Sequence, residues 1–184
     1  YVEGKYDKAL KAFTSLQTDD EYDALVPYYI GEIYLLRGEY QKADEVASDY
    51  LRHFAGHKDE AEMMRVQGEA RYGMKDYLAA VSSLEGYVNA VASPQRKAMY
   101  ELGMSYYHTG AYLKATEMLG RTTMVQDALA QNANLHMGLA YLQLKERNQA
   151  RMAFEQASIG DYDKAVKEQA LYNYALCIHE TSYS

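Results

Sequence analysis

The sequence predicts an all-α protein, an α-α superhelix built from antiparallel helix pairs. Three observations favour this fold class. The chain of 184 residues contains only 2 Pro, few enough to leave long helices uninterrupted. Apolar and small residues follow the three- and four-residue spacing of a helix, as in Pro27, Ile30 and Tyr34. A pattern of Gly, Tyr and Ala also recurs every 34 to 37 residues, which is the sequence mark of a solenoid.

The recurring pattern is clearest in two stretches, GEIYLLRGEYQKA (31–43) and GMSYYHTGAYLKA (103–115). Both place Gly, Tyr, Gly, Tyr and Ala at the same five positions. The first small residue of each copy is Gly31, Gly68, Gly103, Gly138 or Ala175. We interpret it as the point where the first helix of a pair (helix A) crosses the second (helix B). Side chains at a crossing set the distance between packed helices, so small ones allow close approach.

The frame gives the expected elements in order. We expect one array over residues 1–184, beginning with helix B of a truncated repeat at 1–17. Full repeats are expected at 24–57, 61–91, 96–124 and 131–160, and helix A of a last truncated repeat at 162–184. Gly38 and Gly110 lie where helix A should end, because glycine tolerates the left-handed conformation that stops a helix. Since the frame is incomplete at both ends, we expect a fragment of a longer array.

The pattern resembles the tetratricopeptide repeat (TPR). The shared features are a period near 34, small residues at the eighth and twentieth positions of the repeat, and aromatic residues at the eleventh and seventeenth. The resemblance covers essentially the whole chain, although no single copy is complete. The usual first aromatic is replaced in five copies by Pro27, Met64, Met99, Asn134 and Leu171. Lys75 and Lys145 stand where helix A would normally end in Gly.

The resemblance implies a concave face, formed by the A helices, that holds a peptide or a segment of a partner protein. The candidate binding residues carried over from the family are Tyr28, Tyr29, Glu32, Arg65, Glu69, Tyr72, Lys97, Tyr100, Met104, Tyr107, His136, Leu139, Tyr172 and Asn173. Tyrosine offers a large contact area with a polar tip, which suits a binding surface. For the outer residues Tyr28, Tyr100 and Tyr107, packing between neighbouring repeats is an equally good interpretation.

Several other functions are disfavoured by the sequence. The net charge is −7, and the chain lacks the cluster of basic residues that a nucleic-acid surface needs. It also lacks the apolar run of about 20 residues that would insert into a membrane. Among TPR proteins, those that bind chaperone tails hold a carboxylate with several basic residues. Here only Arg65 and Lys97 are basic at those places, next to several glutamates, so we do not expect that use.

We expect no catalytic site, no metal and no cofactor. His53 and His57 are four residues apart, but Gly56 should break the helix between them, so a solvated loop is favoured over a metal site. Cys177 and His179 are two residues apart on one helix and therefore should point to different sides. The sequence also contains none of the common phosphate-binding or hydrolase motifs.

We therefore expect a protein–protein interaction scaffold. The alternative is a structural spacer or self-assembly module of a larger envelope protein, with self-association through exposed terminal helices. Leu171, Tyr174 and Ile178 would be uncovered in that case. A catalytic domain outside these residues is a third possibility. The run ALYNYALCIHETSYS resembles helix A of repeat arrays in bacterial cell-envelope proteins, which suggests a periplasmic or envelope location, with the cytoplasm as the alternative.

Overall fold

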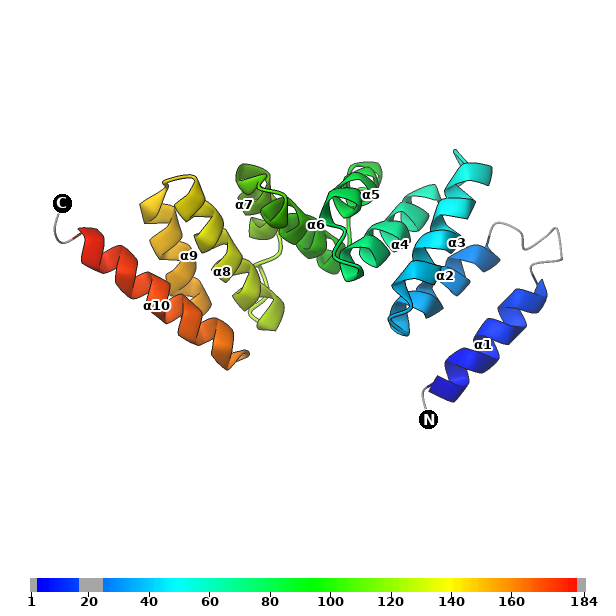
Figure 1. Ribbon diagram of the computed structural model, residues 1–184, viewed down its shortest axis with the longest axis horizontal. Coiled ribbons are helices and arrows are strands. Elements are labelled where there is room, and N and C mark those ends of the chain that lie inside the picture. The colour runs from blue at the N-terminus through cyan, green and yellow to red at the C-terminus, as the bar shows by residue number, and fades with distance from the viewer. Residues whose placement is uncertain (1–2, 17–24, 182–184) are drawn as a thin grey trace. The chain divides into compact units, whose positions relative to one another are not determined.

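The computed structural model describes residues 3–16 and 25–181, and all regular secondary structure in those ranges is α-helical, as predicted (Figure 1). The helices are α1 (Glu3–Leu16), α2 (Val26–Leu36), α3 (Tyr40–His53), α4 (Glu60–Gly73), α5 (Tyr77–Ala90), α6 (Arg96–His108), α7 (Tyr112–Gly120), α8 (Ala128–Gln143), α9 (Arg147–Ile159) and α10 (Lys164–Thr181). They group into two compact units, residues 1–94 and 95–184, which we call unit 1 and unit 2.

Unit 1 contains α1 to α5, and each helix packs against the next one in the chain. The helices α2 and α4 are A helices, followed by their B partners α3 and α5 (Figure 1). The A helices α2 and α4 also contact each other directly. Side chains on neighbouring A helices can therefore meet within this unit.

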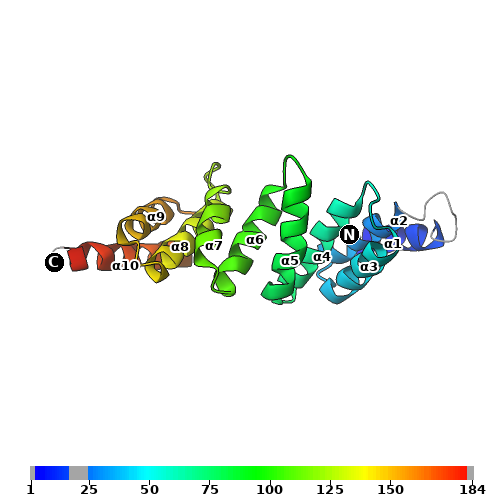
Figure 2. The same ribbon diagram turned by 90° about the horizontal axis from the view of Figure 1, so that it is seen from above.

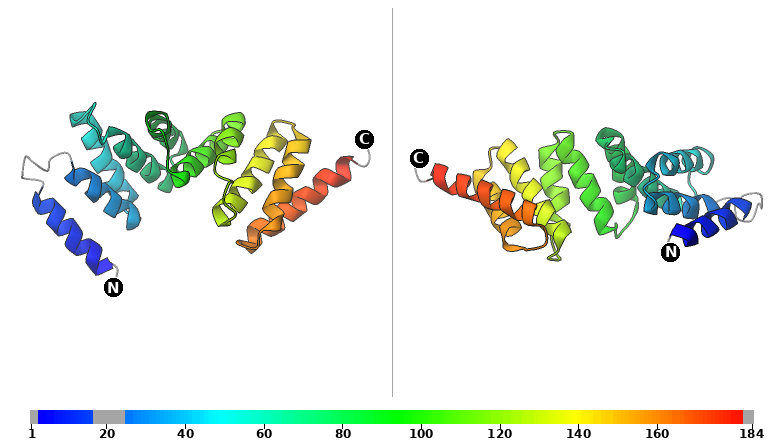
Figure 3. Two further views of the ribbon diagram at one scale, coloured as in Figure 1. Left: turned by 180° about the vertical axis from the view of Figure 1, so that it is seen from behind. Right: turned by 60° about the horizontal axis from the view of Figure 1, so that its bottom comes forward.

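Unit 2 contains α6 to α10 and has the same organisation. Its A helices are α6, α8 and α10, and α8 contacts both of the others. The pair α6 and α7 lies side by side in Figure 2, and α9 packs on both α8 and α10, as Figure 3 shows from behind. Across the described residues of both units, every helix is too short or too polar to cross a lipid bilayer.

The core of each pair is a stripe of three B-helix positions, spaced four and three residues apart. The members are at most 2% exposed: Ala43, Ala47 and Tyr50; Ala80, Leu84 and Tyr87; Ala115, Leu119 and Thr122; and Ala150, Phe154 and Ala157. In α3, α5 and α9 the spacing places all three positions on one helix face, whereas Thr122 lies in the turn just after α7. The third position was not recognised in the sequence, since its residue type changes from Tyr to Thr to Ala along the chain.

Four of the five small residues of the A helices, the glycines, lie at helix contacts, whereas Ala175 of α10 is exposed. A Cβ atom added at Gly68 or Gly138 would lie 2.5 Å from Leu84 or Phe154 of the paired B helix. At Gly31 it would instead meet Val66 of α4, at 2.9 Å. The paired position in α3 is Ala47, whose side chain is too short to reach Gly31. Gly31 therefore marks a contact between neighbouring A helices, where a crossing within the pair was expected.

The turns that end the A helices share one backbone conformation. Gly38 and Gly110 have φ values of 71° and 81°, in the left-handed region expected for them. Lys75 and Lys145, which replace glycine in the equivalent turns, adopt the same conformation, with φ values of 63° and 62°. The turn geometry is therefore set by the repeat, and these two lysines bear the steric strain that a Cβ atom brings to it.

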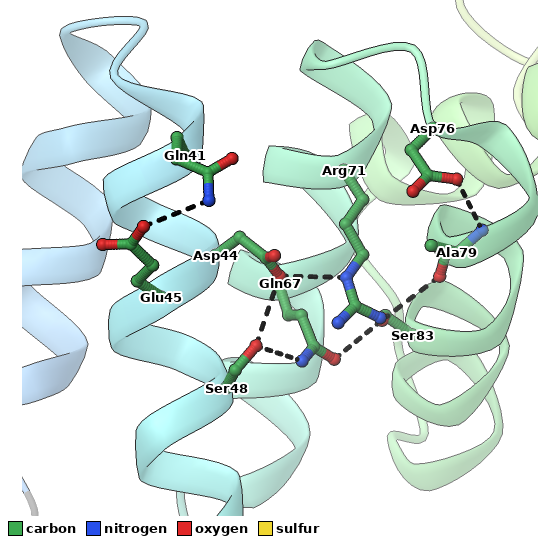
Figure 4. Close-up of polar contacts among 9 residues, drawn as sticks. All are labelled: Gln41, Asp44, Glu45, Ser48, Gln67, Arg71, Asp76, Ala79 and Ser83. Atoms are coloured by element: carbon green, nitrogen blue, oxygen red, sulfur yellow. Dashed lines mark hydrogen bonds and ion pairs between the residues drawn. The ribbon is translucent and has the colours of Figure 1, made fainter.

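In unit 1, a ring of hydrogen bonds connects three successive helices (Figure 4). Arg71 of α4 donates from Nε to Asp44 Oδ1 of α3 (2.9 Å) and from Nη1 to Ser83 Oγ of α5 (3.0 Å). Ser83 donates to Gln67 Oε1 (2.7 Å), Gln67 Nε2 donates to Ser48 Oγ (2.9 Å), and Ser48 donates to Asp44 (3.3 Å). Each side chain is satisfied by its neighbours, so the ring favours one register of the three helices.

Unit 2 uses long side chains to hold its connecting loops. The buried Gln131 donates from Nε2 to the carbonyl oxygens of Ala157 (3.0 Å) and Gly160 (2.6 Å), and its Oε1 accepts from Asp163 N (2.8 Å). This one amide thus ties α8 to the connection between α9 and α10. Without it, polar backbone groups at that connection would lose their partners.

Candidate partner-binding face

The predicted binding residues are distributed over the A helices of both units, and we treat each unit by itself. In unit 1 they lie on α2 and α4, and in unit 2 on α6, α8 and α10. We use the name A-helix face for the surface formed by these residues.

The centre of the face in unit 1 is an ion-pair cluster around Arg65. Arg65 is only 3% exposed. Its Nε donates to Glu62 Oε2 (2.7 Å), its Nη1 to Glu69 Oε1 (3.0 Å), and its Nη2 to Glu32 Oε1 of the neighbouring A helix. The guanidinium is thus engaged on all three sides. Its role in the structure is to join α2 to α4.

The Arg65 cluster gives this face a negative character, since three carboxylates surround one cation. Glu32 and Glu62 keep 27% and 35% of their side chains exposed. Burial raises the pKa of Glu62, and repulsion from Glu69 and Asp59 adds to the rise. The arrangement therefore disfavours an incoming carboxylate at this place.

The tyrosines of unit 1 are partly covered by their neighbours. The ring of Tyr29, 41% exposed, stacks on Phe13 of α1 with centroids 5.0 Å apart, and it meets Tyr28 edge to face at 5.4 Å. Tyr72 contacts Tyr77 of the paired B helix at 5.8 Å. Packing of the tyrosines is therefore shown here, while their use in binding stays a prediction.

Unit 2 presents an aromatic and histidine patch formed by α6 and α8. The ring of Tyr107 lies 5.0 Å from that of His136, edge to face, and 5.9 Å from that of Tyr112. The hydroxyl of Tyr100 accepts a hydrogen bond from Asn132 Nδ2, and His136 Nδ1 lies 2.9 Å from the carbonyl oxygen of Asn132. Asn132 therefore fixes the orientation of both Tyr100 and His136.

Burial sets the protonation states in this patch. It raises the pKa of the Tyr107 hydroxyl and, more than the Asn132 bond lowers it, that of Tyr100. It also lowers the pKa of His136, against the opposing effect of the hydrogen bond to the Asn132 carbonyl. At neutral pH these groups are uncharged, with Nδ1 of His136 protonated so that it can donate to that carbonyl.

The remaining face residues of unit 2 differ widely in exposure. Met104 is only 4% exposed and belongs to the core side of α6, whereas Leu139 is half-buried beside the core of α8 to α10. The side chain of Lys97 is 61% exposed, with its Nζ 3.6 Å from Glu101 Oε1. Tyr172 is 66% exposed, and Asn173 Nδ2 donates to the Gln169 carbonyl oxygen (2.8 Å).

Helix α10 places its expected uncovered residues in two environments. Leu171 and Ile178 are 46% and 41% exposed. Tyr174 instead packs against the apolar cluster of α8 to α10, together with the buried Cys177. His179 is exposed, so Cys177 and His179 lie on different sides of the helix.

The two histidines weighed as metal ligands have separate partners. His57 Nδ1 lies 2.9 Å from the Tyr50 hydroxyl, and His53 Nδ1 lies 2.8 Å from the Asp49 carbonyl oxygen. The helix α3 ends at His53, and Gly56 has a φ of 79°. The two imidazoles thus belong to different local structures, one at a helix end and one in the following turn.

The comparisons with known proteins can now be added to this geometry. Residues 132–158 match the tetratricopeptide repeat family model. Comparison with curated protein sequences finds no match. Among solved structures, YrrB, described as a TPR protein with an unusual peptide-binding site, has a TM-score of 0.75 at 19% identity, covering 93% of this chain and 86% of its own.

Structures of MamA are also similar. One has a TM-score of 0.69 at 24% identity, covering 85% of this chain and 88% of its own, and MamA from Desulfovibrio magneticus RS-1 has a TM-score of 0.67 at 22% identity, covering 84% and 85%. Residues 132–158 are thus similar to a tetratricopeptide repeat, and the chain has the TPR-like helical-repeat fold of these solved structures. At these identities, the likeness to YrrB and MamA concerns the fold alone.

Proposed function

We propose that this chain is an interaction scaffold whose A-helix face receives a segment of a partner protein. The main support is the patch on α6 and α8, where Tyr100, Tyr107 and His136 are only partly buried and are oriented by Asn132 and by each other. An aromatic surface whose rotamers are already fixed loses little conformational entropy on binding.

The charge of the A-helix face supports a binding role over a catalytic one. In unit 1, Arg65 is fully engaged by Glu32, Glu62 and Glu69. In unit 2, the patch on α6 and α8 consists of neutral groups at neutral pH. We propose that neither unit carries out chemistry on its partner, and that both serve to position it.

The test is affinity selection with the native chain and with its Tyr100→Ala and Tyr107→Ala variants. Tyr162→Ala is the matched control, because Tyr162 is 54% exposed and lies in the connection between α9 and α10. We expect the first two variants to lose partners that the control retains. Partners retained equally by all three variants would remove the patch from consideration.

A second candidate function, self-assembly, is favoured by the exposed side chains of α10. Leu171 and Ile178 are seven residues apart on one face of the helix, and both are largely exposed. The variant Leu171→Asp with Ile178→Asp should then abolish association seen by sedimentation velocity at high concentration. A chain that is monomeric at every concentration would exclude this candidate.

A further inference from the structure

A cleft of about 440 Å³ lies in unit 2 between the end of α8, the start of α9 and the second half of α10. Its lining residues are Leu142, Lys145, Arg147, Asn173, Leu176 and Cys177. The volume is within the range of about 300–1,000 Å³ that is usual for ligand sites. Leu142, Asn173 and Leu176 occupy ligand-facing positions of the repeat, so they connect the cleft to the A-helix face, whereas Lys145, Arg147 and Cys177 were not predicted as binding residues.

The cleft combines an apolar side with a basic rim. Leu142, Leu176 and Cys177 supply the apolar side, and Leu176 is 43% exposed, which is unusual for a leucine beside a core. Lys145 and Arg147 supply the rim. Glu146, between them in the sequence, is not among the lining residues. These two basic residues give the cleft a local positive charge next to an aliphatic surface, although the whole chain has a net charge of −7.

The position of Lys145 is defined by the turn that carries it. Its backbone N donates to the Leu142 carbonyl oxygen (3.0 Å), and its φ is 62°. Lys145 is exposed and makes no ion pair with the residues that the structure describes. Its ammonium group can therefore pair with a carboxylate brought by a ligand. Asn173 donates through Nδ2 to Gln169, which leaves Oδ1 to accept a bond from a peptide N–H.

We propose that this cleft binds an acidic, leucine-containing segment of a partner protein. An aliphatic side chain of the segment packs on Leu142 and Leu176, and flanking carboxylates pair with Lys145 and Arg147. The inference rests on the proposed scaffold function and names the chemistry of the partner. The negative face of unit 1 would repel the same segment, so charge assigns it to this cleft.

The test uses three peptides, acetylated and amidated at their ends. The probe is Glu-Glu-Leu-Leu-Glu-Glu, and the comparisons are Glu-Glu-Ser-Ser-Glu-Glu and Lys-Lys-Leu-Leu-Lys-Lys. Binding is measured by isothermal titration at low and at moderate salt. We expect only the probe to bind in a way that depends on the cleft, with affinity falling as salt rises, because carboxylate–lysine pairs are screened.

The variants are Lys145→Glu and Leu176→Asp, and the matched control is Lys75→Glu. Lys75 occupies the equivalent turn of unit 1 with nearly the same φ, so both substitutions place the same side chain in the same backbone conformation. We expect about a tenfold or greater loss of probe affinity in Lys145→Glu and no change in Lys75→Glu. Leu176→Asp, at an exposed position, should also lose the probe while keeping the native melting temperature.

Three results would overturn the inference: equal effects of the two lysine variants, equal binding of the serine peptide, or no binding of the probe. If the probe fails while Lys145→Glu breaks up a self-association of the chain, the occupant is a second copy and the inference is wrong. The Tyr107→Ala variant separates this test from that of the scaffold function. Loss of the probe only in Lys145→Glu, with partners indifferent to Tyr107→Ala, would support the cleft and reject the aromatic patch.

Discussion

At the scale of single residues, the repeat imposes a backbone conformation to which the side chain must adapt. Lys75 and Lys145 occupy left-handed turns in which Gly38 and Gly110 are found elsewhere. A residue with a Cβ atom destabilises the folded state by about 1–2 kcal/mol in this conformation. Glycine avoids that strain, but it loses part of the advantage because its unfolded chain has more conformational freedom. The equivalent turns of one array therefore differ in strain although they share a shape.

Replacing either lysine by glycine should stabilise the protein. We expect Lys75→Gly and Lys145→Gly each to raise the free energy of unfolding by about 0.5–1 kcal/mol, because the strain is removed. Urea denaturation would measure the change. The matched control is Gly38→Ala, which should destabilise for backbone reasons only, since a Cβ atom there would meet nothing within 4 Å. An unchanged free energy of unfolding, both in the lysine-to-glycine variants and in Gly38→Ala, would contradict the proposed strain.

The glycines at helix crossings predict a graded response to alanine. An added methyl group at Gly68 or Gly138 would clash with Leu84 or Phe154 at 2.5 Å, and such overpacking costs about 1–3 kcal/mol. Alanine recovers about 1 kcal/mol through helix propensity, so we expect a net loss of up to about 2 kcal/mol. Gly31→Ala should be close to neutral, because it meets a single methyl group of Val66. Thermal denaturation would rank the three variants, and an equal loss at all three would be inconsistent with the crossings described.

At the scale of helices, polar side chains decide how neighbouring elements align. The ring of Asp44, Ser48, Gln67, Arg71 and Ser83 joins α3, α4 and α5 in unit 1. In unit 2, Arg96 at the start of α6 donates to both carboxylate oxygens of Asp127, at 2.6 and 2.8 Å, and to the Thr122 carbonyl oxygen at 2.8 Å. Apolar packing brings the helices together, and these contacts favour one alignment over others.

Removing one oxygen atom, Oγ of Ser83, should open the hydrogen-bond ring in unit 1. Ser83→Ala removes a donor and an acceptor from a 5% exposed position, so Gln67 Oε1 and Arg71 Nη1 each lose the bond to Ser83 while the bonds to Ser48 and Asp44 remain. We expect a loss of about 1–2 kcal/mol in the free energy of unfolding. Ser82→Ala is the control, because Ser82 precedes it on the exposed side of α5 and should change stability by less than about 0.5 kcal/mol.

The Arg96–Asp127 pair should be visible in the pH dependence of stability. The bond from Arg96 lowers the pKa of Asp127 from 3.8 to about 2, assisted by the backbone N–H of Ala130. Because the pKa is lower in the folded state, the stabilisation is present above 3.8 and is lost as pH falls toward 2.

The variant Asp127→Asn keeps an N-cap for α8 and removes the charge. We expect it to be less stable than the native protein in urea at about pH 5.5, and the difference to shrink at about pH 3. A difference that is constant with pH would mean that the pair contributes nothing through charge.

At the scale of the whole molecule, the described residues form two units that each have their own core. One cluster in unit 1 centres on Tyr50, Met63 and Val66, and one in unit 2 on Leu135, Phe154 and Cys177. In a repeat protein, stability is the sum of local repeats and the contacts between neighbours. Units with separate cores are therefore candidates for separate folding.

We expect residues 1–94 and 95–184, produced separately, each to give a cooperative helical melting curve by circular dichroism. Gln131→Ala serves as the control, because it should lower the melting temperature of 95–184 and cannot affect 1–94. If neither half shows a cooperative transition, folding depends on interactions beyond those within each unit.

The sequence predicts the architecture well because the evidence for it is repeated. Each A helix carries a small residue at the same position, Gly in four and Ala175 in the last, and each B helix carries an alanine. An incomplete copy can therefore be recognised from the complete ones. The face was harder to predict, because its chemistry depends on pairs in different repeats. Glu32 reaches Arg65, and Tyr107 meets His136, across 33 and 29 positions of sequence. A repeat frame gives the place of each residue but not the identity of its neighbour.

Burial within the face could not be predicted for the same reason. Arg65 and Met104 occupy family positions that contact ligands, yet both are less than 5% exposed here. Arg65 is covered because carboxylates on its own helix and on α2 surround it. The basic rim of the cleft was missed because Lys145 was considered only as a replacement for glycine.

The third core position of the B helices shrinks from Tyr50 and Tyr87 to Thr122 and then to Ala157. The helix pairs, which look interchangeable in the repeat pattern, thus differ in the volume of this buried side chain. Exchanging two of them would leave a hole at one site and crowd the other, so duplication or shuffling would require compensating changes elsewhere. The size of this one side chain thus distinguishes the first two helix pairs from the third and the fourth.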